Sequence, residues 1–535
     1  MWILFGGGKT QWNIFRHNGP MFPDEYTPHN LSISINNQKI TLSPELEEKI
    51  TIYAKYINTD YLNNSKFNKN FFNEIKDYDE IKNYTFEQFI NADFSLITKF
   101  LEKEREKRLS LSKETKEKNK EKQIELEKPY SLLQIDGSEQ KVGNFKIEPP
   151  GIFLGRGSHP KIGKWKKRIY PEDVTLNLDK DAPIPKPHLY PDRKWGKIVH
   201  QTEAIWLATW KDEITGKNKY VFPSVESSFK SESDKDKFDL ARKLKKKIAS
   251  IRTQFMEDLK SDDITKKQFA TALYFIDEMA LRVGGKKDAK EQADTVGVTS
   301  LRVEHIILQD NNTIRLDFLG KDSIRFCKVT KVHEDVYNNL QTFVQNKDKK
   351  EDLFDKINSN TLNNYLKSFM DDLSAKVWRT YKASTTFQKE LAKIKDEDIK
   401  DLNENEKINY LLSKFNYANT QVALLCNHQK GVSKNFDDQI DKIKNRIKEL
   451  RKKKSKAKTK EKQQSYSNKI LLEKSKLETK TKMKNVSLGT SKTNYIDPRI
   501  IMAFADRFNF PLEKLFTKTL LARFEWAKVD KTFTF

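Results

Sequence analysis

Residues 491–499 read SKTNYIDPR and come directly after a long lysine-rich tract. That tract, residues 436–483, places apolar side chains at a three-four spacing on either side of a nearly all-polar stretch. The spacing predicts two helices that pack antiparallel as a short coiled-coil hairpin. Most lysines of the hairpin are expected to face solvent, and Tyr495 is expected to lie just beyond its end.

Upstream of the hairpin, the sequence has the periodicity of a mainly helical region. Apolar spacing predicts one helix that begins near Asp236 and a second one that ends at Gly284-Gly285, because glycine commonly stops a helix. Two short apolar runs on either side of residues 320–322 predict a β-hairpin. Further helices are expected at about residues 360–375 and 416–427.

The first 230 residues mix short strands with a charged helix. Residues 31–35 alternate polar and apolar side chains, which predicts a strand. Residues 101–128 are mainly Lys and Glu without Gly or Pro, which predicts one exposed helix. Residues 130–230 are rich in Pro, Gly and Trp, so short strands joined by tight turns are expected. A chain of 535 residues is too long for a single core, and several domains are expected.

The composition favours a polyanionic partner. The formal net charge is +24, so binding to phosphate groups with a strong salt dependence is expected. The alternative is a merely soluble basic protein, or one from an AT-rich genome whose codons favour Lys and Asn. Charged residues make up 33% and apolar residues 36%, which fits compact parts joined by charged helical segments.

Simple counts exclude several classes of protein. Only Cys327 and Cys426 occur, which rules out a disulfide framework and a cysteine-based zinc site and favours a reducing compartment. No apolar run approaches the roughly 18 residues of a membrane span. The apolar start of the chain is too short for a signal-peptide core, so an intracellular protein is expected.

Several common catalytic motifs are absent from the sequence. Residues 6–10 read GGGKT, but Ile3 stands where a phosphate loop requires glycine, so residues 1–10 are expected to be a flexible terminus. The sequence has no metalloprotease motif, no nucleophile elbow and no cluster of carboxylates typical of a two-metal nuclease.

Five side chains far apart in the sequence form a set that suits attack on a phosphodiester without a metal. A phenol is a nucleophile, an ammonium can deliver a proton, and guanidinium forks match phosphate oxygens. Taken singly, each has a structural explanation: an arginine at a helix end is commonly a cap, a hairpin lysine is commonly solvated, and a lone histidine is commonly structural. The five candidates are Tyr495, Arg282, Lys321, Arg379 and His428.

Eight short sequence motifs occur along the chain in an order that is specific to one protein family. They are NFKIEPPG at 144–151, ALYFID at 272–277, ADTVG at 293–297, SLRVEHI at 300–306, DFLGKDSIR at 317–325, CNHQ at 426–429, LGTSK at 488–492 and FEWA at 524–527. These strings resemble the eukaryotic DNA topoisomerase I family, the type IB enzymes, whose catalytic fold is like that of tyrosine recombinases. The resemblance runs from about residue 11 to Phe535.

The resemblance implies a multidomain α+β protein in the form of a bilobed clamp around duplex DNA. It would consist of a mixed α/β cap, a mainly helical catalytic lobe, an antiparallel coiled-coil linker and a small helical C-terminal domain that carries the tyrosine. The implied bounds are 11–225 for the cap, 226–433 for the catalytic lobe, 434–484 for the linker and 485–535 for the C-terminal domain.

The resemblance also implies a role for each of the five candidates. Tyr495 is expected to attack a backbone phosphorus, expel the 5′ oxygen and leave a 3′-phosphotyrosine. Arg282, Arg379 and His428 are expected to stabilise the charge of the transition state, and Lys321 is expected to protonate the leaving oxygen. The phosphotyrosine keeps the energy of the broken ester, so religation would need no ATP. Strand rotation between the two steps would relax supercoils of either sign.

Two lips are implied to close the clamp. Residues 155–161 (GRGSHPK) resemble one and residues 286–291 (KKDAKE) the other, with Lys161 and Glu291 expected to pair. Leu154 departs from the family pattern, which has a basic residue there. Contacts mainly to phosphates would give weak sequence preference. The residues expected to contact DNA are Arg156, His159, Lys161, Lys164, Lys166, Lys167, Arg168, Asp322 and Asn494.

Double-stranded DNA is the expected partner of a monomer that binds no membrane. No metal site and no required cofactor are expected, neither ATP nor a metal, with divalent cations at most stimulatory. The expected location is the nucleus. The family's long N-terminal extension with its import signals has little counterpart here, so a nucleus-like organelle or a virus-infected cell is the alternative.

Two other functions fit parts of the sequence. A tyrosine recombinase uses the same residue types, but it would lack the cap and the long hairpin and would need paired specific sites. A non-enzymatic DNA-binding or scaffold protein would explain the charge and the coiled coil. It would give no reason for the five candidates.

Overall fold

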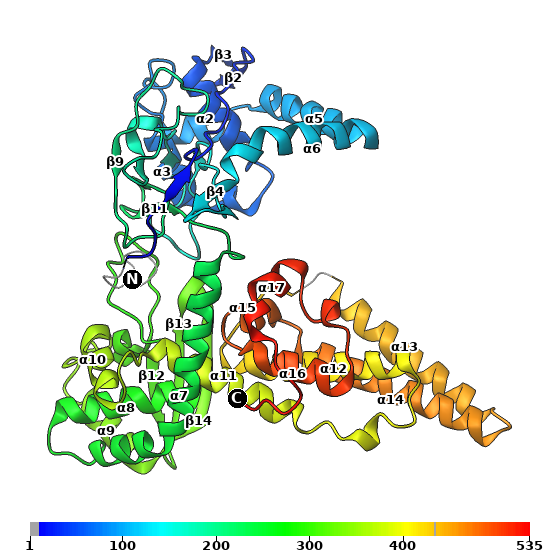
Figure 1. Cartoon of the computed structure of the whole chain (residues 1–535). Coiled ribbons are helices and arrows are strands. Elements are labelled where there is room, and N and C mark those ends of the chain that lie inside the picture. Colours follow the sequence, from blue (N-terminus) through cyan, green and yellow to red (C-terminus); the bar gives the residue numbers. More distant parts are fainter. Residues whose placement is uncertain (1–9, 433–434) are drawn as a thin grey trace. The chain divides into compact units, whose positions relative to one another are not determined.

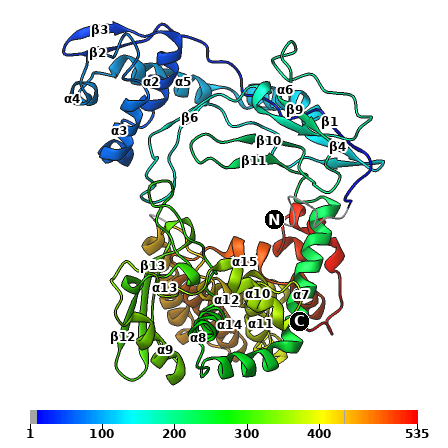
Figure 2. The same cartoon turned by 90° about the vertical axis from the view of Figure 1, so that its left-hand side faces the viewer.

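The computed structural model describes residues 10–432 and 435–535. It is a mixed α+β multidomain protein, about half helical with small sheets (Figures 1 and 2). One compact unit contains the residues up to Lys230 together with Lys287–Asp294, and the other contains Ser231–Lys286 and Thr295–Phe535. Apart from Thr10, the expected flexible terminus and the GGGKT string lie outside the described residues.

The first unit has two hydrophobic cores. In one, helices pack on the β2–β3 hairpin around Tyr53 and Phe71; the other includes Trp12 and Leu176 and is built on the small sheets. The helices are α2 (Pro44–Ala54), α3 (Ser65–Asn73), α4 (Phe86–Ile90), α5 (Ser95–Ser110) and α6 (Lys113–Glu127).

Short strands of the first unit form four sheets, and the strand predicted at residues 31–35 is present as β2. One sheet has the order β1-β4-β5 and another the order β11-β10-β8-β9, in which β8 and β9 are parallel; β2 pairs with β3 and β6 with β7. The strands are β1 (Phe15–His17), β2 (Ser32–Ile35), β3 (Gln38–Thr41), β4 (Leu132–Ile135), β5 (Ser138–Lys141), β6 (Gly151–Ile152), β7 (Trp165–Lys166), β8 (Thr175–Asn177), β9 (Lys197–Val199), β10 (Ala208–Lys211) and β11 (Asn218–Val221).

The charged segment after residue 95 forms two helices, so the prediction of one helix over residues 101–128 is wrong. The helix breaks at Leu111, and the side chain of Ser112 accepts a hydrogen bond from the amide of Thr115 at 3.1 Å. A serine that caps in this way starts a new helix even where the charge pattern continues without a change. No residue of α6 is buried, which agrees with the predicted exposure.

The second unit is mainly helical and has one large core, which extends from α7 and α8 to α16 and includes Tyr495. Among its described residues, three strands form a sheet with the order β12-β13-β14. The elements are α7 (Ser228–Asp258), α8 (Ile264–Met279), β12 (Ile306–Gln309), β13 (Thr313–Leu319), β14 (Arg325–Lys331), α9 (Glu334–Val344), α10 (Ser359–Phe369), α11 (Ala375–Leu391), α12 (Glu404–Leu425), α13 (Phe436–Ser455), α14 (Lys460–Lys482), α15 (Leu488–Asn494), α16 (Pro498–Phe508) and α17 (Lys518–Arg523).

The predicted β-hairpin around residues 320–322 is present as β13 and β14, with Leu319 opposite Arg325. The helix expected at 360–375 is present as α10, but it ends earlier than predicted, at Phe369; the next helix, α11, begins at Ala375. The helix expected at 416–427 is the C-terminal part of the much longer α12.

Helices α13 and α14 occupy the segment from which a helical hairpin was predicted. They lie against each other and are joined by a short turn at residues 456–459 (Figure 1). Helix α14 also packs on α12, where the Ser413 and Ser475 hydroxyls lie 2.9 Å apart. The pair is thus attached to the second unit along one of its two helices.

Candidate active site

Four of the five candidate side chains line one cavity of about 260 Å³ in the second unit: Arg282, Lys321, Arg379 and His428. The fifth, Tyr495, follows α15 and is 6% exposed. Its hydroxyl accepts a hydrogen bond from Nη1 of Arg282 at 3.1 Å. The Arg379 guanidinium lies 5.2 Å from the centre of the Tyr495 ring, and the His428 ring lies 5.3 Å from it. The fold therefore brings the five side chains together.

The backbone around Arg282 is held in an unusual conformation. Helix α8 ends at Met279 and not at Gly284 as predicted, because Ala280 adopts a left-handed conformation with φ of 49°. Gly284 is needed for close packing, since a Cβ there would lie 2.5 Å from Cα of Gly297. The carbonyl of Arg282 accepts a hydrogen bond from the Val298 amide at 2.9 Å. Arg282 thus lies in a fixed loop beyond the helix, not at the helix end.

Arg379 lies in the second turn of α11 and is buried. Its Nη1 donates to the carbonyl of Ala280, and its Nη2 donates to the carbonyl of Cys426 at 3.1 Å. Its Nε has no hydrogen-bond partner in the described parts of the chain. Two carbonyls therefore fix the guanidinium, and its Nε–H is left without a protein partner there.

His428 follows α12, and its amide donates to the carbonyl of Ala423 at 2.8 Å. Ring nitrogen Nδ1 lies 2.7 Å from Oγ of Ser491, whereas Nε2 has no partner among the described residues. Lys321 is exposed in the turn that joins β13 to β14, where the next residue, Asp322, has a left-handed φ of 65°. The turn places the lysine at the cavity.

The cations of the site change the ionisation of its other groups. Burial acts to raise the pKa of the Tyr495 phenol, but Arg379 and Arg282 outweigh it and hold that pKa below its ordinary value. Burial, followed by the charges of Arg379, Arg282 and Lys321, lowers the pKa of His428 to about 3. The site therefore holds an unusually acidic phenol, a neutral imidazole and three cations. It can bind an anion and present an oxygen nucleophile to it.

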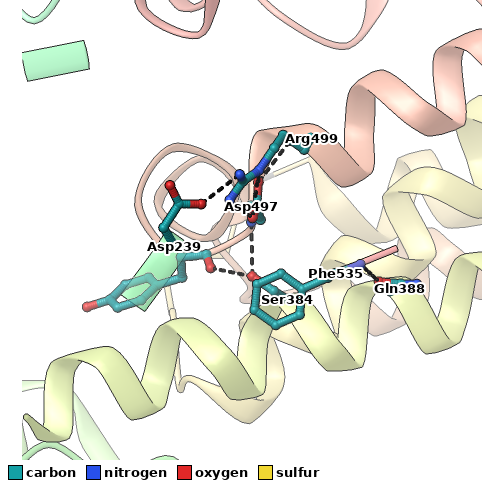
Figure 3. A network of polar contacts seen from close by, with 7 residues as sticks. Asp239, Ser384, Gln388, Asp497, Arg499 and Phe535 are labelled. Atoms are coloured by element: carbon teal, nitrogen blue, oxygen red, sulfur yellow. Dashed lines mark hydrogen bonds and ion pairs between the residues drawn. The ribbon is translucent and has the colours of Figure 1, made fainter. Parts of the chain in front are cut away.

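A polar network around Ser384, Asp497 and Arg499 fixes the backbone that follows Tyr495 (Figure 3). The buried Ser384 hydroxyl on α11 donates to the Tyr495 carbonyl at 3.2 Å and accepts from the Asp497 amide at 3.0 Å. Arg499 bonds the Asp497 carboxylate at 2.8 Å and that of Asp239 on α7 at 2.7 Å. The sequence reasoning missed this network. The Asp-Pro pair at 497–498 was a detectable signal, since it caps and starts α16.

Comparison with known proteins places this site in a family. The model of the eukaryotic DNA topoisomerase I catalytic core matches residues 226–461, that of the family's DNA-binding fragment matches 10–223, and a C-terminal topoisomerase domain matches 467–535. The chain belongs to the eukaryotic DNA topoisomerase I family. It carries the catalytic core of a type I topoisomerase, an isomerase.

Curated topoisomerases match over nearly the whole chain. DNA topoisomerase 1 of Caenorhabditis elegans is 41% identical over 98% of this chain and 67% of its own length. DNA topoisomerase 1 beta of Arabidopsis thaliana is 39% identical over 99% of this chain and 60% of its own length. DNA topoisomerase 1 of Homo sapiens is 38% identical over 97% of this chain and 71% of its own length. The chain thus spans about two thirds of the length of these topoisomerases.

The two lip segments expected in a topoisomerase I clamp contact each other within the first unit. Lys161 forms an ion pair with Glu291 and also donates to the carbonyl of Ile214 at 2.7 Å. Residues 287–294 are part of this unit although both of their flanking segments are part of the other one. Gly155 has a left-handed φ of 64°, and a Cβ there would lie 2.6 Å from Cβ of His159. The lip conformation therefore requires glycine at this position.

The other residues expected to contact DNA differ in how far their charges are already neutralised. Lys166 pairs with Glu148 at 3.2 Å and Lys167 with Glu213 at 3.0 Å. Arg168 is mostly buried and bonds the Glu48 carboxylate at 3.1 Å and the Asp24 carbonyl at 2.8 Å. Arg156 is exposed, Lys164 and His159 are half-buried, Asp322 lines the cavity, and Asn494 is the last residue of α15.

Across 10–432 and 435–535, no group of three or more His, Cys, Asp or Glu side chains is arranged to hold a metal ion. Within the same residues, no helix has the length and apolar character that crossing a membrane requires.

Proposed function

We propose that this protein relaxes positively and negatively supercoiled duplex DNA by transient cleavage of one strand, rotation of the free end and religation. Membership of the topoisomerase I family supports the reaction class. The hydrogen bond from Arg282 to the Tyr495 hydroxyl, in a site with two further cations, is the observation that carries the proposal. It pairs a phenol of lowered pKa with guanidinium groups that suit a phosphate.

In the proposed cleavage step, the Tyr495 oxygen attacks a backbone phosphorus in line with the 5′ oxygen. The bond between the phenolic oxygen and phosphorus forms as the bond to the 5′ oxygen breaks, and the phenol proton goes to solvent. Lys321 gives a proton to the departing 5′ oxygen. A 3′-phosphotyrosine and a free 5′ hydroxyl result. Religation reverses the same steps.

Charge that builds on the non-bridging oxygens needs fixed donors. Arg282 supplies a guanidinium that already contacts the nucleophile. Among the described residues, neither Nε of Arg379 nor Nε2 of His428 has a hydrogen-bond partner. We propose that these two nitrogens bind phosphate oxygens, which would satisfy buried polar atoms that the protein alone leaves unpaired.

The proposal extends to the domains and to DNA binding. Cap residues 11–225 and catalytic residues 226–433 would clasp the duplex, with the Lys161–Glu291 pair holding the lips together. Residues 434–484 would form the linker and residues 485–535 the tyrosine domain. The proposed DNA contacts are Arg156, His159, Lys161, Lys164, Lys166, Lys167, Arg168, Asp322 and Asn494. Because Lys166, Lys167 and Arg168 are paired with carboxylates, they would have to exchange those partners for phosphates.

We further propose that the reaction requires neither ATP nor a metal, that the protein acts as a monomer, and that it acts on nuclear DNA. The phosphotyrosine retains the energy of the broken ester, so sealing needs no nucleotide. Three protein cations at the cavity supply the charge that a metal would otherwise provide.

Plasmid relaxation tests the proposed function. The native protein and Tyr495→Phe are incubated with supercoiled plasmid of either sign in EDTA and without ATP. The native protein is expected to relax both plasmids, and the variant is expected to relax neither while it still binds DNA. Relaxation by Tyr495→Phe would refute the assigned nucleophile. Recombination only between paired sites, without relaxation, would favour a tyrosine recombinase.

A further inference from the structure

His428 can donate a hydrogen bond into the cavity only if the nitrogen that faces a ligand carries the ring proton. The imidazole is buried between the Tyr495 ring and three cations, and its pKa of about 3 makes it neutral at physiological pH. A neutral imidazole carries one ring proton, on Nδ1 or on Nε2, and only the protonated nitrogen can donate a hydrogen bond. The ability of His428 to donate to an anion in the cavity therefore depends on its tautomer.

Ser491 is the residue that faces Nδ1. It lies on α15, it is 0% exposed, and its Oγ is 2.7 Å from Nδ1 of His428. Within the described parts of the chain, this is the only hydrogen bond of the Ser491 hydroxyl, and Nε2 has none. The main chain holds both partners, because the Ser487 amide donates to the His428 carbonyl at 2.8 Å and the Tyr495 amide donates to the Ser491 carbonyl at 2.9 Å.

The two tautomers differ in where a polar hydrogen is left without a partner. If Nδ1 carries the proton and donates to Ser491, the serine hydroxyl hydrogen has no acceptor and is sealed inside the protein. If the serine hydroxyl donates to Nδ1, the remaining hydrogen is on Nε2 of a residue that lines the cavity. Nε2 is itself buried, but because His428 lines the cavity, a ligand that enters the cavity could offer the second hydrogen an acceptor that the first one lacks. An unpaired buried donor is costly.

We propose that Ser491 is a positioning residue that donates its hydroxyl hydrogen to Nδ1 and thereby fixes His428 as the Nε2-protonated tautomer. The Nε2–H is then ready to donate to a non-bridging phosphate oxygen, whereas the other tautomer would present a lone pair to that oxygen. The catalytic part of this inference rests on the proposed function. The tautomer part does not.

Nitrogen NMR of the full-length protein labelled with ¹⁵N-histidine tests the tautomer directly. Solid-state spectra of sedimented protein at pH 7 separate protonated from unprotonated ring nitrogens, and comparison with His428→Gln assigns the signal among the 8 histidines. An unprotonated Nδ1 and a protonated Nε2 are expected in the native protein. A protonated Nδ1 in the native protein would overturn the inference, whatever the activity.

Substitution of Ser491 tests the consequence. In Ser491→Ala, His428 is expected to become a mixture of the two tautomers, so its Nε2–H signal weakens. Single-turnover cleavage is expected to slow by about tenfold to a hundredfold, which is no more than the rate loss caused by removing one fixed donor completely. Ser491→Thr retains the hydroxyl and is expected to restore the signal and most of the rate. The double variant Ser491→Ala/His428→Gln is expected to be no slower than His428→Gln alone.

A matched control removes another buried serine hydroxyl of the same unit. Ser413→Ala deletes the contact with Ser475 on α14 and is expected to leave both the His428 signal and the cleavage rate unchanged. An unchanged tautomer and an unchanged rate in Ser491→Ala would refute the role of Ser491. If Tyr495→Phe retained relaxation while the native tautomer was as expected, the proposed function would fail and the tautomer assignment would stand.

Discussion

Replacing Arg282 with alanine is expected to slow DNA cleavage far more than it weakens DNA binding. The guanidinium donates to the Tyr495 hydroxyl at 3.1 Å, and its charge is one of the two that hold the pKa of that phenol below its ordinary value. Loss of one fixed donor of this type costs about 10²–10³ in rate, or about 3–4 kcal/mol of transition-state stabilisation. Because many phosphate contacts are proposed to hold the duplex, the loss of one is expected to change Kd by less than about tenfold.

The same variant has a second consequence, in the pH dependence of cleavage. Burial acts to raise the pKa of Tyr495, and in Arg282→Ala only Arg379 would remain to oppose it strongly. The pKa of Tyr495 is therefore expected to rise, and the limb of the pH–rate profile along which the rate increases with pH is expected to move to higher pH. Arg282→Lys keeps the positive charge but loses the planar fork. Its pH dependence of cleavage should therefore stay close to that of the native protein, whereas its cleavage rate should fall.

Two measurements at one salt concentration are needed. Rapid-quench cleavage of a duplex whose cut end cannot religate gives the single-turnover rate, and fluorescence anisotropy gives Kd. A loss in Kd as large as the loss in rate would refute a transition-state role for Arg282. An unchanged pH–rate profile in Arg282→Ala would refute the electrostatic account of Tyr495.

Three other variants test separate parts of the site. Lys321→Ala should cleave a normal duplex slowly but recover on a substrate with sulfur in place of the scissile 5′ oxygen, since a thiolate leaves without a proton; absence of recovery would exclude Lys321 as the acid. Ser384→Ala should reduce the unfolding free energy by about 1–3 kcal/mol in denaturant titrations and slow cleavage at unchanged Kd, because the Asp497 amide loses its acceptor. The pKa of His428 is lowered from 6.5 to about 3, so its contribution to stability is complete above pH 6.5 and falls as pH falls towards 3. At pH 5, the native protein should have lost about 2 kcal/mol more than His428→Gln, in which other groups such as His17, whose pKa is lowered to about 4, still titrate; an equal loss in both would contradict the lowered pKa.

Sequence patterns predicted the elements that form between residues close together in the chain. The β13–β14 hairpin follows from alternation and a short turn, and α13 and α14 follow from their apolar spacing. The end of α8 was mispredicted because two glycines indicated a helix stop. Gly284 is instead required by its contact with Gly297, thirteen residues away, and Ala280 takes the left-handed position at the helix end. A contact between residues far apart in the sequence cannot be predicted from the few residues around each of them.

The proximity of the five site residues could not be predicted from their local sequence. Arg379 reaches the site because the carbonyls of Ala280 and Cys426 hold it, and both lie on other segments. Their chemistry and the resemblance to a known family singled out the five. The structure adds the contacts of Tyr495 with Arg282, Arg379 and His428 and the cavity that Lys321 shares with the last three. Ser384 and Ser491 escaped notice because single buried hydroxyls have no sequence signature, although each contacts a residue of the site.

Trapping the covalent intermediate tests the central claim most directly. A duplex nicked a few nucleotides downstream of the cleavage site, so that the short fragment with the new 5′ hydroxyl is lost after cleavage, is incubated with the protein in EDTA. The linked peptide is then identified by mass spectrometry after digestion of the protein and the DNA. The account predicts a 3′-phosphate ester on Tyr495 in the native protein and no adduct in Tyr495→Phe. An adduct on another residue, attachment at a 5′ end, or cleavage without any adduct would contradict it.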